Sequence, residues 1–330
     1  MGQLVNGKWD PEANQGGAGI RHWLTQDGSP GPDGQKGFPA EKGRYALYVA
    51  HGCPFAHRTV LIRKLKKLED AIPLYVTSPT VPQRTGWNFD TKVAGTTGDP
   101  VNHFKTLSEL YIQTDPNYTG RVTVPVLYDT KDKVIVNNES SDIVEMLNTA
   151  FNHLGADPYD YVPESDHEHI NQLTGEMVGN ISGSLYRALF TKDQATFDEY
   201  QARIFDSLQS LDKELAQQRY IAGPKITAAD IYLFVILVRA PIQLPFARLI
   251  YRRPQDYPNL WNYAKDLYQS GFGETVNWEH IVALIFAGHD YDAAGIIPRA
   301  PEIDLLSAHN RAELEYEVKD SAQIHRNKYI

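Results

Sequence analysis

The chain has 330 residues, of which 42% are hydrophobic and 22% charged, and its formal net charge at pH 7 is −9. This length and composition exclude a disordered or fibrous protein and favour two globular domains, and the acidic balance argues against nucleic acid as a partner. No stretch approaches 18 apolar residues and the N-terminus lacks the pattern of a signal peptide, so we expect a cytoplasmic protein without a membrane partner.

Residues 1–43 are rich in glycine and proline and show little apolar periodicity, which predicts an N-terminal extension on the surface. The pattern then changes. Residues 45–50 alternate like a strand, residues 58–68 carry apolar side chains at helical spacing, and residues 72–77 read as the next strand. This order predicts a βαβ unit in which Cys53 lies at the turn between the first strand and the helix.

Two helices and two strands are predicted after the βαβ unit. We expect a helix over residues 103–114, a strand over 121–129, its hairpin partner over 133–138 and a helix over 139–151. The resulting order βαβ, α, ββ, α is that of an α/β thioredoxin-like domain, to which we assign residues 44–150.

Helical patterns dominate the rest of the chain, so residues 151–330 predict an all-α C-terminal domain that ends in a C-terminal tail. The clearest helix start is at Thr227, an N-cap whose capping-box acid is Asp230. The continuation, residues 231–238, is apolar on all sides, which is typical of a buried central helix.

Cys53 is the only cysteine in the chain. No intramolecular disulfide can form, so any redox chemistry at this thiol needs a second thiol from outside the chain. Unpaired N–H groups and the positive end of the helix dipole favour the thiolate at a helix start and lower the pKa of such a thiol, and Pro54 suits the first helical position. The alternative interpretation is a buried structural cysteine.

Two further stretches supply parts of a ligand groove. Pro125, at the start of a predicted strand, is a candidate cis proline that leaves the backbone of Val124 free to pair with an extended peptide; the alternative is an ordinary edge-strand proline. Glu139, Ser140 and Ser141 at a helix N-terminus can hold an amino-acid head group, although simple helix capping is the alternative. Together these features predict a groove with a thiolate at one end, an edge for a peptide backbone in the middle and a pocket for an amino-acid head group. Glutathione has a sulfur, a peptide backbone and an amino-acid head group in that order.

A set of spaced motifs between about residues 44 and 270 resembles the xi class of glutathione transferases, the glutathionyl-hydroquinone reductases, with the omega class as nearer relatives outside it. The motifs are RYALYVAHGCPFAHRTVLIRKLKKLE, GWNFD, GRVTVPVLYD, VNNESSDIVEMLN, RYIAG, TAADIYLF and DYPNLW. The resemblance implies a glutathione transferase fold, glutathione as co-substrate and a homodimer. It further implies that the all-helical domain, residues 151–330, contributes the aromatic-substrate site. It also implies that Cys53 attacks the sulfur of a glutathionylated aromatic and that a second glutathione resolves the mixed disulfide.

The same resemblance assigns roles to further residues. Tyr186 matches a tyrosine that faces the small aromatic substrate and could donate a proton to it; the alternative is a helix tyrosine that faces the protein core. The positions that match the glutathione-binding residues of the family are Phe55, Trp87, Val124, Pro125, Glu139 and Ser140.

The chain departs from the family pattern at three places. Phe55 replaces the tryptophan of the family's CPWAHR motif, the family's HYY.SH segment falls on ALIFAG at residues 283–288, and RAPIQLP at residues 239–245 replaces an RFD-type segment. The last two changes remove polar groups from the aromatic-substrate side. Two alternatives therefore stay open: an omega-like thioltransferase that acts on small disulfides, and a non-catalytic ligand-binding glutathione transferase.

Histidines offer no clear second site. His57, four residues after Cys53, could be a base for the thiol, but the family carries the same His-Arg pair and we favour a packing or domain-contact role. His167 and His169 are two residues apart on a predicted helix and would point to different sides, so we expect no metal.

Overall fold

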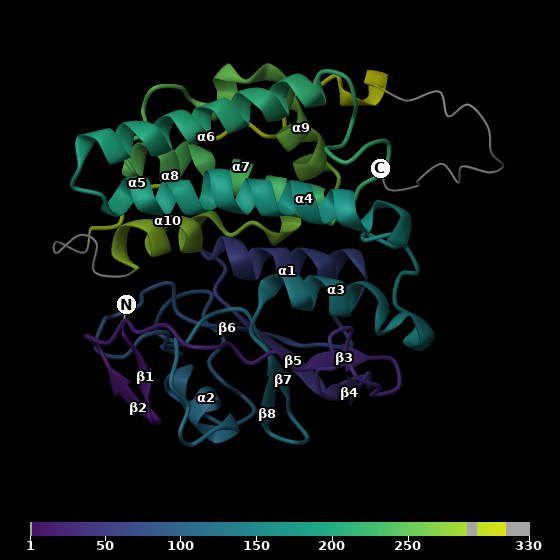
Figure 1. Cartoon of the computed structure of the whole chain (residues 1–330), viewed down its shortest axis with the longest axis vertical. Helices are drawn as coiled ribbons and strands as arrows, with labels where there is room; N and C mark the ends of the chain where they lie inside the picture. The colour runs from purple at the N-terminus through teal and green to yellow at the C-terminus, as the bar shows by residue number, and fades with distance from the viewer. Residues whose placement is uncertain (1, 289–295, 315–330) are drawn as a thin grey trace. The chain divides into compact units, whose positions relative to one another are not determined.

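The computed structural model of the chain describes residues 2–288 and 296–314 (Figure 1). The chain forms two compact units, Met1–Asp160 with Asn277–Ala300, and Tyr161–Val276 with Pro301–Ile330. The N-terminal extension therefore belongs to the first unit. The sequence-based division into 1–43, 44–150 and 151–330 stays a prediction, and of its last segment residues 289–295 and 315–330 lie outside the described residues.

The first unit is built on a four-stranded sheet of order β6-β5-β7-β8, in which β6 is parallel to β5 and the other pairs are antiparallel. Its elements, in chain order, are β5 (Tyr45–Val49), α1 (Pro54–Leu65), β6 (Leu74–Val76), α2 (Ser108–Thr114), β7 (Val126–Asp129), β8 (Val134–Asn137) and α3 (Ser140–Thr149). This confirms the predicted order βαβ, α, ββ, α. All residues of β5 are buried because α1 and α3 cover one face of the sheet and α2 lies on the other (Figure 1).

Two predicted elements begin later than expected. The helix predicted from residue 103 starts at Ser108, because the carboxylate of Asp99 accepts hydrogen bonds from the backbone N–H groups of Val101 and Phe104 at 3.1 and 3.2 Å and holds that stretch as a loop. The strand predicted from residue 121 starts at Val126, after Pro125, which has no N–H to donate to a neighbouring strand.

The N-terminal extension is folded into the first unit. It forms an antiparallel hairpin, β1 (Gln3–Val5) with β2 (Lys8–Asp10), and a parallel pair, β3 (Trp23–Thr25) with β4 (Gly37–Pro39). The prediction that the extension lies on the surface was wrong for four apolar side chains, those of Leu4, Leu24, Phe38 and Ala40, which are buried. As a set they follow no sustained helical or strand period, so the sequence pattern did not reveal them.

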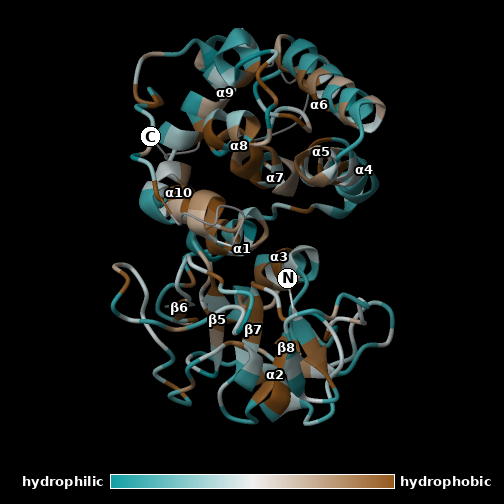
Figure 2. Ribbon diagram, turned by 90° about the vertical axis from the view of Figure 1, so that its left-hand side faces the viewer, coloured by the Kyte–Doolittle hydropathy of each residue, from teal (hydrophilic) through white to brown (hydrophobic). Residues whose placement is uncertain are grey.

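The second unit is helical, and its described residues contain no strand. Its α-helices are α4 (His167–Met177), α5 (Ser184–Phe190), α6 (Gln194–Leu215), α7 (Ala228–Leu237), α8 (Ala240–Phe246) and α9 (Pro258–Gln269). All ten residues of α7 are buried, which confirms the predicted central helix, drawn mostly in brown in Figure 2. In the part of the chain that the structure describes, no single helix could span a membrane; only α7 and α8 together have the length and composition, and a 53° bend separates them.

The predicted capping box at the start of α7 is confirmed. Asp230 is fully buried, and its Oδ2 accepts from the backbone N–H of Thr227 at 2.7 Å. Its Oδ1 accepts from the Ile221 N–H at 3.0 Å and from the Tyr263 hydroxyl of α9 at 2.7 Å. Burial raises the pKa of Asp230, and these donors act in the opposite direction. One carboxylate thus joins α7, α9 and the loop before α7.

Helix α10 (Trp278–Ala287) lies in sequence between the two segments of the second unit but belongs to the first unit. A Cβ on Gly52 would lie 2.5 Å from the His280 carbonyl oxygen and 2.6 Å from the Leu284 Cβ, so the backbone of α10 touches the turn before Cys53. The His280 ring donates from Nε2 to the Ala94 carbonyl oxygen at 2.7 Å. The sequence-based division placed this helix with the C-terminal domain, because an apolar pattern identifies a buried face and not its partner.

We expect Gly52→Ala to lower the free energy of unfolding by about 1–3 kcal/mol, because the new Cβ overlaps the backbone of α10. Urea unfolding followed by circular dichroism measures this. Gly175→Ala in α4 is the matched control, since a Cβ there meets nothing within 4 Å, and it should preserve or raise stability. Equal unfolding midpoints for wild type and Gly52→Ala would contradict the contact.

We expect Asp230→Asn to cost about 1–3 kcal/mol for each donor that it leaves unpaired, because an amide nitrogen replaces one of the two accepting oxygens. The control is Asp193→Asn at the exposed N-cap of α6, where asparagine caps as well as aspartate. Thermal unfolding of both variants tests this. A loss at position 193 as large as at 230 would refute the special role of Asp230.

Candidate active site

Cys53 is the N-cap residue of α1, with φ −75° and ψ 124°, and Pro54 occupies the start of the helix as predicted. The thiol side chain is 8% exposed. The positive end of the α1 dipole lies at this position, where it favours an anionic sulfur. The placement at a strand-to-helix turn, inferred from the sequence, is confirmed, because β5 ends at Val49 and α1 begins at Pro54.

The loop before β7 reaches the sulfur. The peptide bond between Val124 and Pro125 is cis, which confirms the predicted candidate. The carbonyl oxygen of Val124 lies 3.9 Å from the Cys53 Sγ. The structure thus brings together the thiol and the backbone segment that the sequence suggested as a peptide edge.

The start of α3 forms the third part of the site. Glu139 is the N-cap, and its Oε1 accepts from the Ser141 N–H at 3.3 Å, so the capping interaction considered as the alternative is present. Ser140 is buried, and its Oγ accepts from an Arg58 Nη1 at 3.4 Å. The same guanidinium lies 4.7 Å above the ring of Phe55. Arg58 therefore joins the helix that begins at Cys53 to the helix that begins at Ser140.

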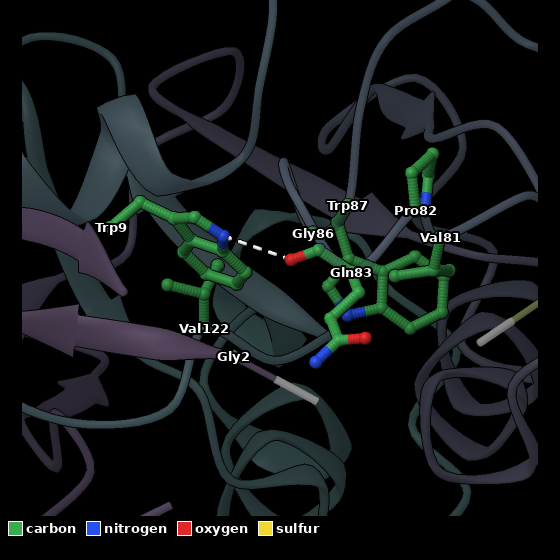
Figure 3. Close-up of a pocket in the computed structure, with 8 residues that line it drawn as sticks. All are labelled: Gly2, Trp9, Val81, Pro82, Gln83, Gly86, Trp87 and Val122. Atoms are coloured by element: carbon green, nitrogen blue, oxygen red, sulfur yellow. Dashed lines mark hydrogen bonds between the residues drawn. The ribbon is translucent and has the colours of Figure 1, made fainter. Parts of the chain in front are cut away.

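Trp87 lies in the loop after β6 and is 6% exposed. It borders a small pocket (Figure 3), whose lining residues are Gly2, Trp9, Val81, Pro82, Gln83, Gly86, Trp87 and Val122. The indole Nε1 of Trp9 donates to the Gln83 carbonyl oxygen at 3.0 Å, drawn as the dashed line. Gly86 has φ +66°, and a Cβ there would lie 2.6 Å from the Trp9 ring.

Sequence reasoning missed Trp9 as a neighbour of the predicted site. A signal was present: Asn6 and Gly7 separate two short β-prone stretches, and this dipeptide is typical of a tight hairpin. Both residues have positive φ, +48° and +70°, as such a turn requires. The hairpin was predictable on this ground, but its packing partner in the loop of Trp87 was not.

Tyr186 lies in α5, directly after a π-helical stretch, Val178–Gly183. Its side chain is half-buried, whereas those of Leu185 and Ala188 are buried. A π-helical insertion rotates the residues after it relative to those before, and such insertions are frequent at functional sites. Tyr186 belongs to the second unit, and the other seven predicted site residues belong to the first.

His57 and the two segments that depart from the family pattern lie mostly in buried parts of helices. His57 is 1% exposed within α1, in agreement with a packing role. Residues 283–285 of the ALIFAG segment are buried in α10, and most of RAPIQLP forms α8. Residues 2–288 and 296–314 contain no group of three or more histidine, cysteine, aspartate or glutamate side chains able to hold a metal ion.

Two family models match the chain. Residues 52–150 match the glutathione S-transferase N-terminal domain, and residues 194–266 match the glutathione S-transferase C-terminal domain. The first match begins after the end of β5 and includes the Cys53 turn, the cis proline and the start of α3.

The chain is similar over nearly its whole length to characterised proteins. It is 42% identical to the glutathionyl-hydroquinone reductase YqjG of Escherichia coli strain K12, covering 94% of this chain and 98% of the relative. It is 34% identical to the glutathionyl-hydroquinone reductase PcpF of Sphingobium chlorophenolicum, covering 91% and 96%.

Solved structures share the fold. The glutathione-bound structure of Escherichia coli YqjG superposes with a TM-score of 0.88 at 43% identity and covers 94% of this chain and 99% of that one. The Xi-class glutathione transferase of Natrialba magadii also has a TM-score of 0.88, at 39% identity, with coverages of 95% and 97%. With both family models matched and these identities extending over almost the entire chain, the protein belongs to the xi class of glutathione transferases.

Proposed function

We propose that this protein is a glutathione-dependent reductase that removes glutathione from glutathionylated hydroquinones. The observation that carries the proposal is the position of Cys53 at the start of α1, with its sulfur 3.9 Å from the carbonyl oxygen of Val124, next to the cis proline. Two relatives at 42% and 34% identity are named glutathionyl-hydroquinone reductases, and one of them was solved with glutathione bound.

The proposed reaction has two steps. The Cys53 thiolate attacks the glutathione sulfur of the aryl thioether; a sulfur–sulfur bond forms, the carbon–sulfur bond breaks, and its electron pair passes to the aromatic carbon, which takes a proton from Tyr186. The thiolate of a second glutathione then attacks the mixed disulfide, so that oxidised glutathione leaves and the Cys53 thiolate is restored. The aromatic is reduced and two glutathione units are oxidised. The single cysteine of the chain requires such an external thiol.

The first unit offers groups for each part of glutathione. The backbone of Val124 would pair with the peptide, and the N-terminus of α3, with Ser140, would hold the α-carboxylate of the γ-glutamyl group. The Glu139 carboxylate would give up its hydrogen bond from the Ser141 N–H and bind the ammonium of the γ-glutamyl group instead. Phe55 and Trp87 would provide apolar walls, and Pro125 would keep the Val124 carbonyl directed toward the site.

We also propose that the active form is a cytoplasmic homodimer, as the family resemblance implies. An omega-like thioltransferase is the second candidate function. It is favoured by a relative in Schizosaccharomyces pombe strain 972 named glutathione S-transferase omega-like 2, which is 35% identical over 81% of this chain. That activity would need Cys53 and the glutathione-binding residues but not Tyr186.

We expect Cys53→Ser to abolish release of menadione from glutathionyl-menadione while calorimetric binding of glutathione persists, because only the nucleophile is lost. Turnover of hydroxyethyl disulfide mixed with glutathione should vanish as well. Retained turnover of either substrate would exclude Cys53 as the nucleophile. A wild-type protein that binds both ligands but turns over neither would instead be a ligand-binding glutathione transferase.

We expect Tyr186→Phe to lower kcat for glutathionyl-menadione about 100-fold, the usual contribution of a general acid, and to leave disulfide turnover unchanged, because a thiolate leaves without a proton. The control is Tyr200→Phe on α6, whose hydroxyl accepts a hydrogen bond from Arg187 of α5 at 2.9 Å. Steady-state kinetics with glutathionyl-menadione and with hydroxyethyl disulfide measure the loss of kcat for each substrate. An equal loss with the two substrates would contradict proton donation by Tyr186.

A further inference from the structure

The N-terminal extension pairs with the backbone that leads into Glu139. The N–H of His22 donates to the Val136 carbonyl oxygen at 2.9 Å, and the N–H of Asn138 donates to the Ile20 carbonyl oxygen at 3.1 Å. The Asn138 Oδ1 also accepts from the Ile20 N–H at 2.8 Å. Residues 20–22 therefore lie along β8 and its exit, and they hold the segment that ends at the N-cap of α3.

Arg21, between these backbone contacts, reaches the first turn of α3. Its Nη2 donates to the Asp142 Oδ1 at 2.6 Å and its Nε donates to the Asp142 Oδ2. Asp142 is 8% exposed, and its Oδ2 also accepts from the Asn137 Nδ2 at 2.9 Å. The Asn137 Oδ1 in turn accepts from the Glu139 N–H at 2.7 Å. Arg21 is thus linked to Glu139 through two side chains.

The charges at this helix end explain why an arginine is needed. Asp142 places a carboxylate in the first turn of α3, at the same helix end that would receive the α-carboxylate of glutathione. Two negative charges at one helix N-terminus repel each other. The bidentate guanidinium of Arg21 neutralises the charge of Asp142, which is the one that the protein contributes. The pKa of Arg21 is raised, chiefly by its hydrogen bond to Asp142, with the charge of Glu139 contributing.

The N-terminal hairpin of the extension contacts the loop after β6, which carries the proposed glutathione-binding residue Trp87. Trp9 packs against Gly86, the residue before Trp87, and donates to the Gln83 carbonyl oxygen (Figure 3). The Gln83 Nε2 donates to the Pro11 carbonyl oxygen at 3.1 Å. The extension therefore contacts two separate loops that carry proposed glutathione-binding residues.

We propose that the extension is a structural part of the glutathione site and that Arg21 is its positioning residue, neutralising Asp142 and holding the start of α3 for the γ-glutamyl carboxylate. This inference rests on the proposed function, since it concerns the co-substrate of that reaction. Arg21 acts through Asp142 and Glu139, so its loss should weaken glutathione binding and leave the chemical step at Cys53 intact.

The test compares calorimetric glutathione affinity and steady-state kinetics with glutathionyl-menadione in matched variants. We expect Arg21→Ala to raise the Kd and KM for glutathione about tenfold, equivalent to about 1.4 kcal/mol, with kcat at saturating glutathione within about twofold of wild type. Arg21→Lys should restore part of the affinity, because it keeps the charge without the bidentate geometry. Arg21→Ala combined with Asp142→Asn should also recover affinity, because the repelling charge is gone.

Arg121→Ala is the control for loosening of the extension alone. The Arg121 Nη2 donates to the Asn14 Oδ1 at 3.0 Å, so this arginine also attaches the extension to the rest of the first unit, but at the loop before β7 and not at α3. It should leave glutathione affinity unchanged. Unfolding midpoints of all variants, followed by circular dichroism, verify that they are folded at the assay temperature.

Glutathione affinity of Arg21→Ala within twofold of wild type would overturn the inference, as would an equal loss in Arg121→Ala or a lysine variant no better than alanine. A wild-type protein that binds no glutathione would refute the proposed function and this inference with it. Wild-type turnover with an unaffected Arg21→Ala variant would refute the inference alone.

Discussion

Close packing at the turn between β5 and α1 is the constraint on which the site depends. Cys53 occupies the N-cap of α1, so its sulfur faces the positive end of the helix, and the carbonyl oxygen of Val124 lies 3.9 Å away. On the other side, the backbone of α10 approaches Gly52 so closely that no Cβ fits. The backbone of this turn therefore cannot move toward α10 without displacing that helix.

Segments from both ends of the chain are built around the thioredoxin-like sheet. The N-terminal extension contributes Arg21 beside the start of α3 and Trp9 beside the loop of Trp87. Helix α10 contributes His280, which binds the carbonyl oxygen of Ala94. A small sheet exposes its connecting loops, and such loops are the most mobile part of a domain unless other segments hold them. The long-range contacts supply this restraint where the ligand is proposed to bind.

The second unit has its own source of rigidity. Asp230 is fully buried and joins Thr227, Ile221 and Tyr263, so that α7, α9 and the preceding loop share one acceptor. The apolar surface of α7 surrounds this polar centre, and a buried polar group with all its partners specifies one arrangement of the helices. Tyr186 lies in the same unit, in α5, which directly follows the π-helical stretch Val178–Gly183.

The sequence by itself determined the elements whose signals are local. The order of strands and helices around Cys53, the cis bond before Pro125, the capping box at Thr227 and the buried α7 were all predictable, because periodicity, proline and capping residues act within a few positions. Only the tertiary structure decided that α10 packs on Gly52 and that Arg21 pairs with Asp142, 121 residues away. Such contacts depend on the path of the chain in space, and a periodic pattern records which face of a segment is buried without recording what buries it.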